Sequence, residues 1–309
     1  MKVIYDKKGW DERAVMATIG FFDGVHPGHR FLLQEMQMLA KERHILSAVI
    51  TFPVHPRVVL QSDYQPKLLN SFDEKLNLLA QTGVDYIIVM DFTPELARLT
   101  AREFIENVLI LEWKVQTLLV GYNHRFGFQH AEEDEQFVLE EMVKGMEIIR
   151  SASFSNENGI TISSSIIRRL IETGDVKAAS RMLGYDYRLK GHVVTGNKIG
   201  RILGFPTANL EMDEKFKVMP RFGSYAVRVL IDGKKYNGML YIGSRPTIGV
   251  NNSLHIEVNI FDFSDDIYNM PVIIEFIEFI REDRKFDSLD ELCKQLGEDK
   301  EKAGLVNSE

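Results

Sequence analysis

The hydrophobic pattern of this chain changes its period near residues 184–188. Before that point, short apolar runs alternate with amphipathic stretches, which is the pattern of a parallel α/β sheet. The expected strands are residues 16–19, 47–52, 86–90, 117–120 and 147–149. The expected helices are residues 30–43, 73–81, 101–109, 163–173 and 175–183. The sequence therefore predicts a first domain, of the α/β class, over residues 1–184.

After residue 184 the apolar runs are short, often β-branched, and separated by turn signals such as Asp232-Gly233. The expected strands are residues 188–195, 224–231, 235–242, 254–261 and 272–280, and a charged helix is expected from about Ser288. This pattern predicts a small antiparallel β domain, a barrel, over residues 185–309. A chain of 309 residues is long enough for two domains with separate cores.

Composition excludes several classes of protein. The chain is 45% hydrophobic and 27% charged, as is typical of a globular protein. No stretch approaches the roughly 20 apolar residues that cross a bilayer, and the start of the chain lacks a signal-peptide core. We therefore expect a cytoplasmic protein that does not bind membranes. The formal net charge of −8 argues against nonspecific binding to nucleic acid, so anionic ligands must be held by local groups.

The single cysteine, Cys293, excludes an internal disulfide and a multi-cysteine metal site. Two segments, His130-Ala-Glu132 and His255-Ile-Glu257, match the H-x-E half of the zinc deaminase pattern. The other half of that pattern is a C-x-x-C, which one cysteine cannot supply. The chain also lacks the Walker A sequence G-x-x-x-x-G-K-[ST], which excludes an ordinary P-loop.

The strongest chemical signal is the segment GFFDGVHPGH at residues 20–29, between an expected strand and an expected helix. Such a turn places backbone N–H groups and the positive end of a helix at the carboxyl edge of the sheet, where anions bind. Gly28 lets a phosphate approach the backbone, and Pro27 suits the start of a helix. We expect His26 and His29 to face this pocket, where they could donate hydrogen bonds to a phosphoryl transition state. An isolated H-x-x-H is more often an ordinary turn, but the ten-residue context favours the functional interpretation.

This segment resembles the H-x-G-H signature of nucleotidyltransferases, in the form found in bacterial FAD synthetases. Three further segments resemble the same family in the same order: TFPVHP at 51–56, GYNHRFG at 121–127 and ISSSIIR at 162–168. The resemblance implies that His26 and His29 act in catalysis. It implies ATP binding by Gly20, Phe21, Asp23, Gly28, Ser163, Ser164 and Arg168. It implies FMN or FAD binding by His55, Pro56, Asn123 and Arg125.

The second half carries its own signature, a glycine-rich stretch at residues 191–201 that leads into PTAN at 206–209. Thr207 and Asn209 offer compact oxygen ligands that suit Mg²⁺ beside a nucleotide. The string GRILGFPTANL at 200–210 resembles the riboflavin kinase signature, and segments 242–249, 257–263 and 281–286 match it in order. The resemblance implies that Glu257 is the catalytic base and that Thr207 and Asn209 hold the metal. It implies ATP or flavin contacts by Gly196, Gly200, Arg201, Gly204 and Arg281.

The chain is thus identified as a member of the bifunctional prokaryotic riboflavin kinase/FMN adenylyltransferase (FAD synthetase) family. The resemblance covers roughly residues 12–180 and 185–300. It implies a Rossmann-like nucleotidyltransferase domain with a parallel sheet, followed by an antiparallel β-barrel kinase domain. The implied reactions are phosphorylation of riboflavin by ATP to FMN and adenylylation of FMN to FAD, with Mg²⁺ as cofactor. We expect a monomer or a transient homo-oligomer.

Two other interpretations are open. An adenylyltransferase for pantetheine phosphate or a nicotinate nucleotide would explain the first half of the chain and leave the second half without a role. A flavin-binding regulator on a catalytically decayed scaffold is suggested by three departures from the family pattern. Asn123 stands where aspartate is commoner, His130 where arginine often follows, and Asp283 in place of glutamate. The presence of the groups assigned to catalysis argues against decay.

Overall fold

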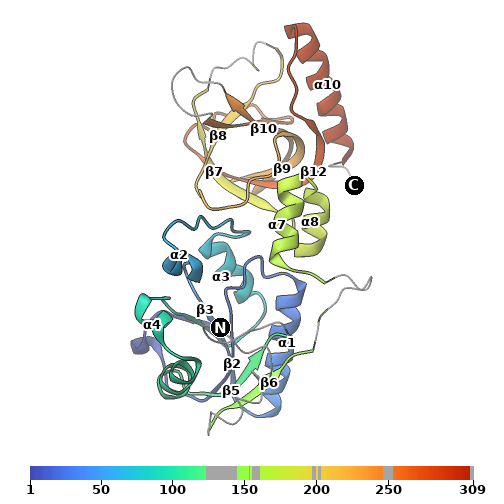
Figure 1. Cartoon of the computed structure of the whole chain (residues 1–309). Coiled ribbons are helices and arrows are strands. Elements are labelled where there is room, and N and C mark those ends of the chain that lie inside the picture. Colours follow the sequence, from blue (N-terminus) through green and yellow to red (C-terminus); the bar gives the residue numbers. More distant parts are fainter. Residues whose placement is uncertain are drawn as a thin grey trace. The chain divides into compact units, whose positions relative to one another are not determined.

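The computed structural model describes residues 1–122, 145–152, 154, 161–196, 200, 203–245 and 253–306. The chain divides into two compact units (Figure 1). The first comprises Met1–Pro66 and Asn70–Ser163, and the second comprises Lys67–Leu69 and Ser164–Glu309. No helix within the described ranges combines the length and the apolar content that a membrane span requires.

A six-stranded parallel sheet forms the centre of the first unit, in the order β1-β4-β3-β2-β5-β6. Its strands are β1 (Lys2–Ile4), β2 (Val15–Ile19), β3 (Leu46–Thr51), β4 (Tyr86–Val89), β5 (Val115–Val120) and β6 (Glu147–Arg150). Alternate residues of one strand enter different cores: Val49 of β3 packs in one, while Ala48 and Ile50 pack in the other. Both faces of the sheet are therefore covered, which explains why its inner strands read as continuous apolar runs.

Helices follow the strands as the sequence predicts. They are α1 (Pro27–Glu42), α2 (Pro56–Leu60), α3 (Phe72–Ala80), α4 (Pro94–Arg98) and α5 (Ala101–Glu103), with the short helix η1 (Lys7–Gly9) near the N-terminus. The stretch expected as one α-helix over 101–109 is a single α turn that continues as a π-helix, η2 (Phe104–Glu112). The predicted parallel α/β fold is confirmed.

The second unit begins with two helices, α7 (Ser164–Thr173) and α8 (Val176–Leu183). Asp175 caps the start of α8, and Gly184 ends it in the left-handed conformation with φ +79°. Six antiparallel strands then close into a barrel in the order β10-β11-β8-β7-β12-β9. They are β7 (Arg188–Val194), β8 (Ala208–Met212), β9 (Gly223–Ile231), β10 (Lys234–Arg245), β11 (Ser253–Ile260) and β12 (Pro271–Glu282). The predicted barrel is confirmed.

The last helix, α10 (Leu289–Val306), lies against the barrel wall (Figure 1). Its Ala303 packs with Ala226 of β9 and Met239 of β10. Asp299 of the same helix is 1% exposed and pairs with Arg281 of β12, with a shortest distance of 2.9 Å. A buried carboxylate requires such a partner, so this ion pair fixes α10 on the barrel.

Candidate active sites

The segment at residues 20–29 lies where the sheet of the first unit reverses its strand order. The chain proceeds from β2 through β3 to β4 on one side, and β5 and β6 lie on the other side of β2. In open α/β sheets, ligands bind outside the carboxyl ends of the strands at such a reversal. His26 is the N-cap residue of α1, and Pro27 occupies its first position. The turn after β2 is therefore in the expected place for an anion site.

His26 and His29 lie face to face in this turn. Their ring centroids are 3.8 Å apart and the rings are nearly parallel, at 17°. His26 is 6% exposed. The Nδ1 atoms of both rings are buried, and neither has a hydrogen-bond partner among the described residues. Buried polar atoms without partners are rare, so this pair of nitrogens marks a place where a ligand can bind.

Burial keeps both imidazole rings neutral. It lowers the pKa of His26 to about 4. Burial, together with the neighbouring His26, lowers the pKa of His29 well below its usual value. Each neutral ring offers one N–H donor and one acceptor nitrogen. A bound polyphosphate would raise both pKa values, because an opposite charge nearby favours the protonated form.

A buried lysine that the sequence did not reveal connects this turn to the loop after β3. Lys75 of α3 is 3% exposed, and its Nζ donates a hydrogen bond to the carbonyl of Phe52 at 2.7 Å. The same atom lies 3.9 Å from the centroid of the Phe21 ring, in a cation–π contact. Burial lowers the pKa of Lys75 to about 7, and the charge of Asp23 opposes that shift. Lys75 thus joins two loops that carry candidate ligand-binding residues.

Lys75 should give the stability of the chain a recognisable pH dependence. Between pH 7 and 10.5 the lysine of the unfolded chain still binds a proton that the buried one has released. The free energy of unfolding of the wild type, relative to Lys75→Met, should therefore rise with pH in this window. Denaturant unfolding of both proteins at a series of pH values measures the difference. A difference that is constant with pH would show that Lys75 stays protonated in the folded chain.

The other predicted residues of this half fall into four groups. His55 caps α2, and its ring lies 4.7 Å from that of Phe21, so the structure brings these two predicted residues together. Asp23 is buried and accepts a hydrogen bond from the Asn70 amide at 3.4 Å. Asn123 and Arg125 lie outside the described residues. The remaining predictions, Ser163, Ser164 and Arg168, lie at the start of α7, and their place beside the triphosphate stays a prediction.

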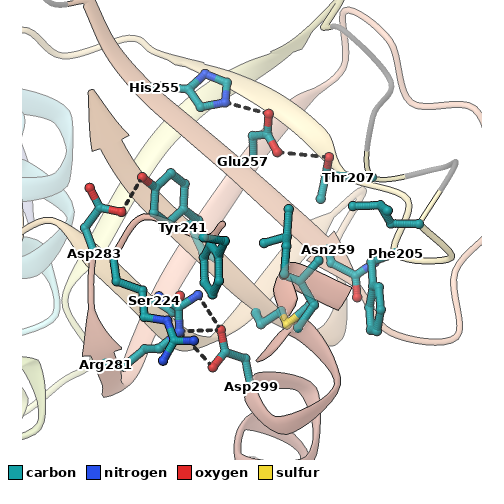
Figure 2. Close-up of a pocket in the computed structure, with 18 of the residues that line it drawn as sticks. Phe205, Thr207, Ser224, Tyr241, His255, Glu257, Asn259, Arg281, Asp283 and Asp299 are labelled. Carbon is teal, nitrogen blue, oxygen red and sulfur yellow. Dashed lines mark hydrogen bonds and ion pairs between the residues drawn. The ribbon is translucent and has the colours of Figure 1, made fainter. Parts of the chain in front are cut away.

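The barrel contains a cavity of about 360 Å³ (Figure 2). This volume lies within the range of small-molecule sites, which is roughly 300–1,000 Å³. Its polar lining comes from four parts of the chain: the PTAN segment, the barrel strands, the segment after β12 and α10, which contributes Asp299. The residues that matter most for the argument are Thr207, Tyr241, His255, Glu257, Asn259, Arg281 and Asp283.

Glu257 lies at the centre of a hydrogen-bond network in this cavity. Thr207 donates its hydroxyl to Oε2 of Glu257 at 3.2 Å, and Nε2 of His255 lies 2.5 Å from Oε1. Asn209 of β8 is directly opposite Glu257 of β11 in the sheet register. Asn259 donates to the carbonyl of Pro206 at 2.6 Å, which fixes the loop that carries Thr207. The predicted base and both predicted metal ligands are therefore neighbours.

At three of the predicted glycine positions, either the surrounding atoms or the backbone conformation disfavours a side chain. A Cβ at Gly196 would lie 2.0 Å from Nδ2 of Asn209. A Cβ at Gly200 would lie 2.3 Å from the carbonyl oxygen of Phe205 and 3.1 Å from the hydroxyl of Thr207. Gly204 has φ +80°, which side chains rarely adopt. The chain thus passes closely over both candidate metal ligands. Arg201 lies outside the described residues.

The donor set at this site suits a hard divalent cation that also binds phosphate. Among the described residues there is no group of three or more His, Cys, Asp or Glu side chains that could hold a metal alone. Mg²⁺ does not need one, because it is commonly held by one or two protein oxygens together with phosphates and water. A hydroxyl from Thr207 and an amide oxygen from Asn209 meet that requirement.

Tyr241, Arg281 and Asp283 also line the cavity. Tyr241 donates its hydroxyl to Asp283 at 2.8 Å, and burial raises the pKa of Tyr241 well above its usual value. Arg281 contributes to the lining while its guanidinium is bound to Asp299. Arg281 therefore has an evident structural role in addition to the predicted ligand contact.

Comparisons with known proteins cover most of the chain. The family model for FAD synthetase matches residues 8–166, and the model for riboflavin kinase matches residues 183–306. The chain is 35% identical over 294 residues to the bifunctional riboflavin kinase/FMN adenylyltransferase of Bacillus subtilis, covering 94% of this chain and 92% of that protein. It is 36% identical over 293 residues to the protein of that name from Escherichia coli K12, covering 93% and 91%. A crystal structure from Streptococcus pneumoniae, described as a macrolide-efflux protein, is 33% identical with a TM-score of 0.85 and 97% coverage of both chains.

Proposed function

Because this chain belongs to the bifunctional riboflavin kinase/FMN adenylyltransferase family, we propose that its two reactions take place at the two sites described above. The enzyme phosphorylates riboflavin to FMN and adenylylates FMN to FAD, using ATP in both steps. We assign the first step to the barrel cavity around Glu257 and the second to the turn of His26 and His29. The observation that carries the assignment is the position of Glu257 in a cavity, between Thr207 and the strand of Asn209.

In the kinase site, Glu257 acts as the general base. It accepts the proton of the riboflavin 5′-hydroxyl while that oxygen forms a bond to the γ-phosphorus of ATP. The bond from the γ-phosphorus to the bridging oxygen breaks, and ADP leaves with the bonding electrons. Thr207 and Asn209 would hold Mg²⁺, which, when bound, neutralises charge on the phosphates. The neighbouring glycines have no side chains to fill the space beside these oxygens, so the nucleotide can approach them.

In the adenylyltransferase site, a phosphate oxygen of FMN attacks the α-phosphorus of ATP and pyrophosphate leaves. This nucleophile is ionised at pH 7, because the second pKa of a phosphate monoester is about 6, so no strong base is required. His26 and His29, both neutral in the free enzyme, donate N–H groups to the phosphoryl oxygens as charge develops. The amides at the start of α1 add further positive potential. Arg168 is assigned to ATP binding only on the resemblance of ISSSIIR to the family motif, where its planar guanidinium suits phosphate.

The boundary between the two catalytic parts is proposed at residues 184 and 185. Supporting this, the first matched segment ends at residue 166 and the second begins at residue 183, the last residue of α8. We place the enzyme in the cytoplasm because both steps consume ATP. We propose that it works as a monomer or a transient homo-oligomer on small-molecule substrates.

Product analysis tests the proposed function. Purified chain incubated with riboflavin, ATP and Mg²⁺ should form FMN first and FAD later, with one pyrophosphate released for each FAD. Pantetheine phosphate and nicotinate mononucleotide should not support pyrophosphate release. Flavin binding without turnover would instead identify a regulator on this scaffold.

Gly196→Ala should disable the kinase selectively. The added Cβ would lie 2.0 Å from the Asn209 amide, so that amide must move. A displacement of about 1 Å at a substrate-positioning group commonly costs about 10²-fold in rate. Gly297→Ala is a matched control, because its Cβ meets nothing within 4 Å. Rates of FMN formation from riboflavin and of FAD formation from FMN should be measured for both variants. A Gly196→Ala enzyme with the wild-type kinase rate would remove Asn209 from the site.

A further inference from the structure

His255 is a titratable side chain in the kinase cavity that the mechanism above does not use. Its Nε2 lies 2.5 Å from Oε1 of Glu257, and the two side chains are 15% and 24% exposed. Both residues belong to β11 and are two positions apart, so they lie on the same face of the strand. Figure 2 shows the imidazole beside the carboxylate, with Thr207 on the other carboxylate oxygen.

This pair is the H-x-E segment that could not be half of a zinc deaminase site, because Cys293 is the single cysteine. The segment lies on a strand, and this determines how its histidine and glutamate are placed relative to each other. On a helix, two residues at this spacing would point in different directions, whereas on a strand they are adjacent on one face. The pattern therefore places a histidine directly beside the proposed base.

The two hydrogen bonds restrict how the Glu257 carboxylate can turn. Among the described residues, the imidazole contacts Oε1 and the Thr207 hydroxyl donates to Oε2. A carboxylate oxygen has two lone-pair sites, so a hydrogen bond from His255 or Thr207 does not by itself prevent the same oxygen from accepting a proton. A base must also be within hydrogen-bond reach and correctly oriented before its basicity matters. Loss of one donor would let the carboxylate rotate away from the substrate hydroxyl.

We propose that His255 is a positioning residue for phosphoryl transfer: it donates its Nε2–H to Oε1 of Glu257 and holds the carboxylate toward the riboflavin 5′-hydroxyl. This inference depends on the proposed role of Glu257 as the base. The substrate proton moves to Glu257, and His255 keeps its own proton throughout the step. His255 acts only through Glu257, and this dependence can be measured.

Two substitutions of similar size distinguish the effect of losing the hydrogen bond from the effect of changing the side-chain volume. His255→Gln keeps an N–H donor on an unbranched chain, and His255→Met removes the donor at similar length. His255→Met should lower the kcat for FMN formation about 10–100-fold, by analogy with the loss seen when a partner that orients a metal ligand is removed. The KM values for riboflavin and ATP should remain close to those of the wild type. His255→Gln should recover most of the lost kcat.

A double-mutant cycle then tests whether His255 acts through Glu257. In the background of Glu257→Gln, adding His255→Met should cause little further loss, because no carboxylate remains to be positioned. His192→Leu is the matched control. It removes another histidine–carboxylate pair from the same barrel, His192 and Asp213 at 2.7 Å, outside the cavity lining. This control should leave kcat unchanged.

Each outcome is decisive. A His255→Met enzyme with wild-type kcat overturns the inference, as does an equal loss in the presence and absence of Glu257. Equal losses of kcat in His255→Met and His255→Gln also overturn it, because the loss would then not come from removing the N–H donor. These results leave the role of Glu257 intact. If Glu257→Gln alone retains kinase turnover, both the proposed base and its positioning partner are rejected.

Discussion

Glu257→Gln should lower the kcat for FMN formation by about 10²–10⁴-fold, while the same protein still converts supplied FMN to FAD. A general base contributes rate in that range. The substitution keeps the size of the side chain but removes its ability to accept the proton of the 5′-hydroxyl. Chromatographic separation of riboflavin, FMN and FAD in timed samples measures both rates in one preparation.

The controls for Glu257→Gln concern folding and binding. The adenylyltransferase rate of the variant reports on the fold, and equal loss of both activities would indicate misfolding or coupled sites. Riboflavin affinity should be measured in parallel. Weakened affinity with unchanged turnover would make Glu257 a substrate-holding residue and would contradict its assignment as the base.

His29→Ala should lower the rate of FAD formation from FMN by about 10²–10³-fold and leave FMN formation from riboflavin nearly intact. That is the usual effect of removing one donor that stabilises developing charge. The structural reason is the position of His29, stacked on His26 with a buried Nδ1 that no described residue engages. Release of pyrophosphate from ATP and FMN measures the effect.

His44→Asn provides the control for His29→Ala within the same unit. His44 is exposed just after α1 and has φ +56°, a conformation that asparagine tolerates. Its replacement should leave both reactions unchanged. A His29→Ala enzyme that keeps at least half of the adenylyltransferase rate would remove His29 from the mechanism.

The sequence predicts most of the fold because the two halves differ in hydrophobic period. It misses β1, which has only three residues, and β8 (Ala208–Met212), which begins inside the PTAN segment. The PTAN segment contains a proline and small polar residues, which resemble a loop rather than a strand. β8 forms because it pairs with β7 and β11, and a pairing between distant segments has no local signal.

Parts of both sites could be predicted because their residues are contiguous in sequence, as in GFFDGVHPGH and GFPTAN. The contacts between distant segments could not. Lys75 reads as a polar residue of an amphipathic helix, yet α3 presents it to the buried side together with Leu79. The 2.0 Å approach of Gly196 to Asn209 depends on how the chain folds back onto β8. A lone strand glutamate is usually exposed to solvent, whereas Glu257 lies in a cavity between two partners.

Mixing the two inactive variants tests most directly whether separate sites on this chain make FAD in sequence. Given riboflavin, ATP and Mg²⁺, Glu257→Gln alone should form little FMN, and His29→Ala alone should accumulate FMN without FAD. An equal mixture should form FAD after a lag, as FMN released by one variant is adenylylated by the other. Failure of the mixture to form FAD while free FMN accumulates would contradict the assignment of the two reactions to the barrel and the sheet. FAD formation from riboflavin at the wild-type rate by either variant alone would contradict it equally.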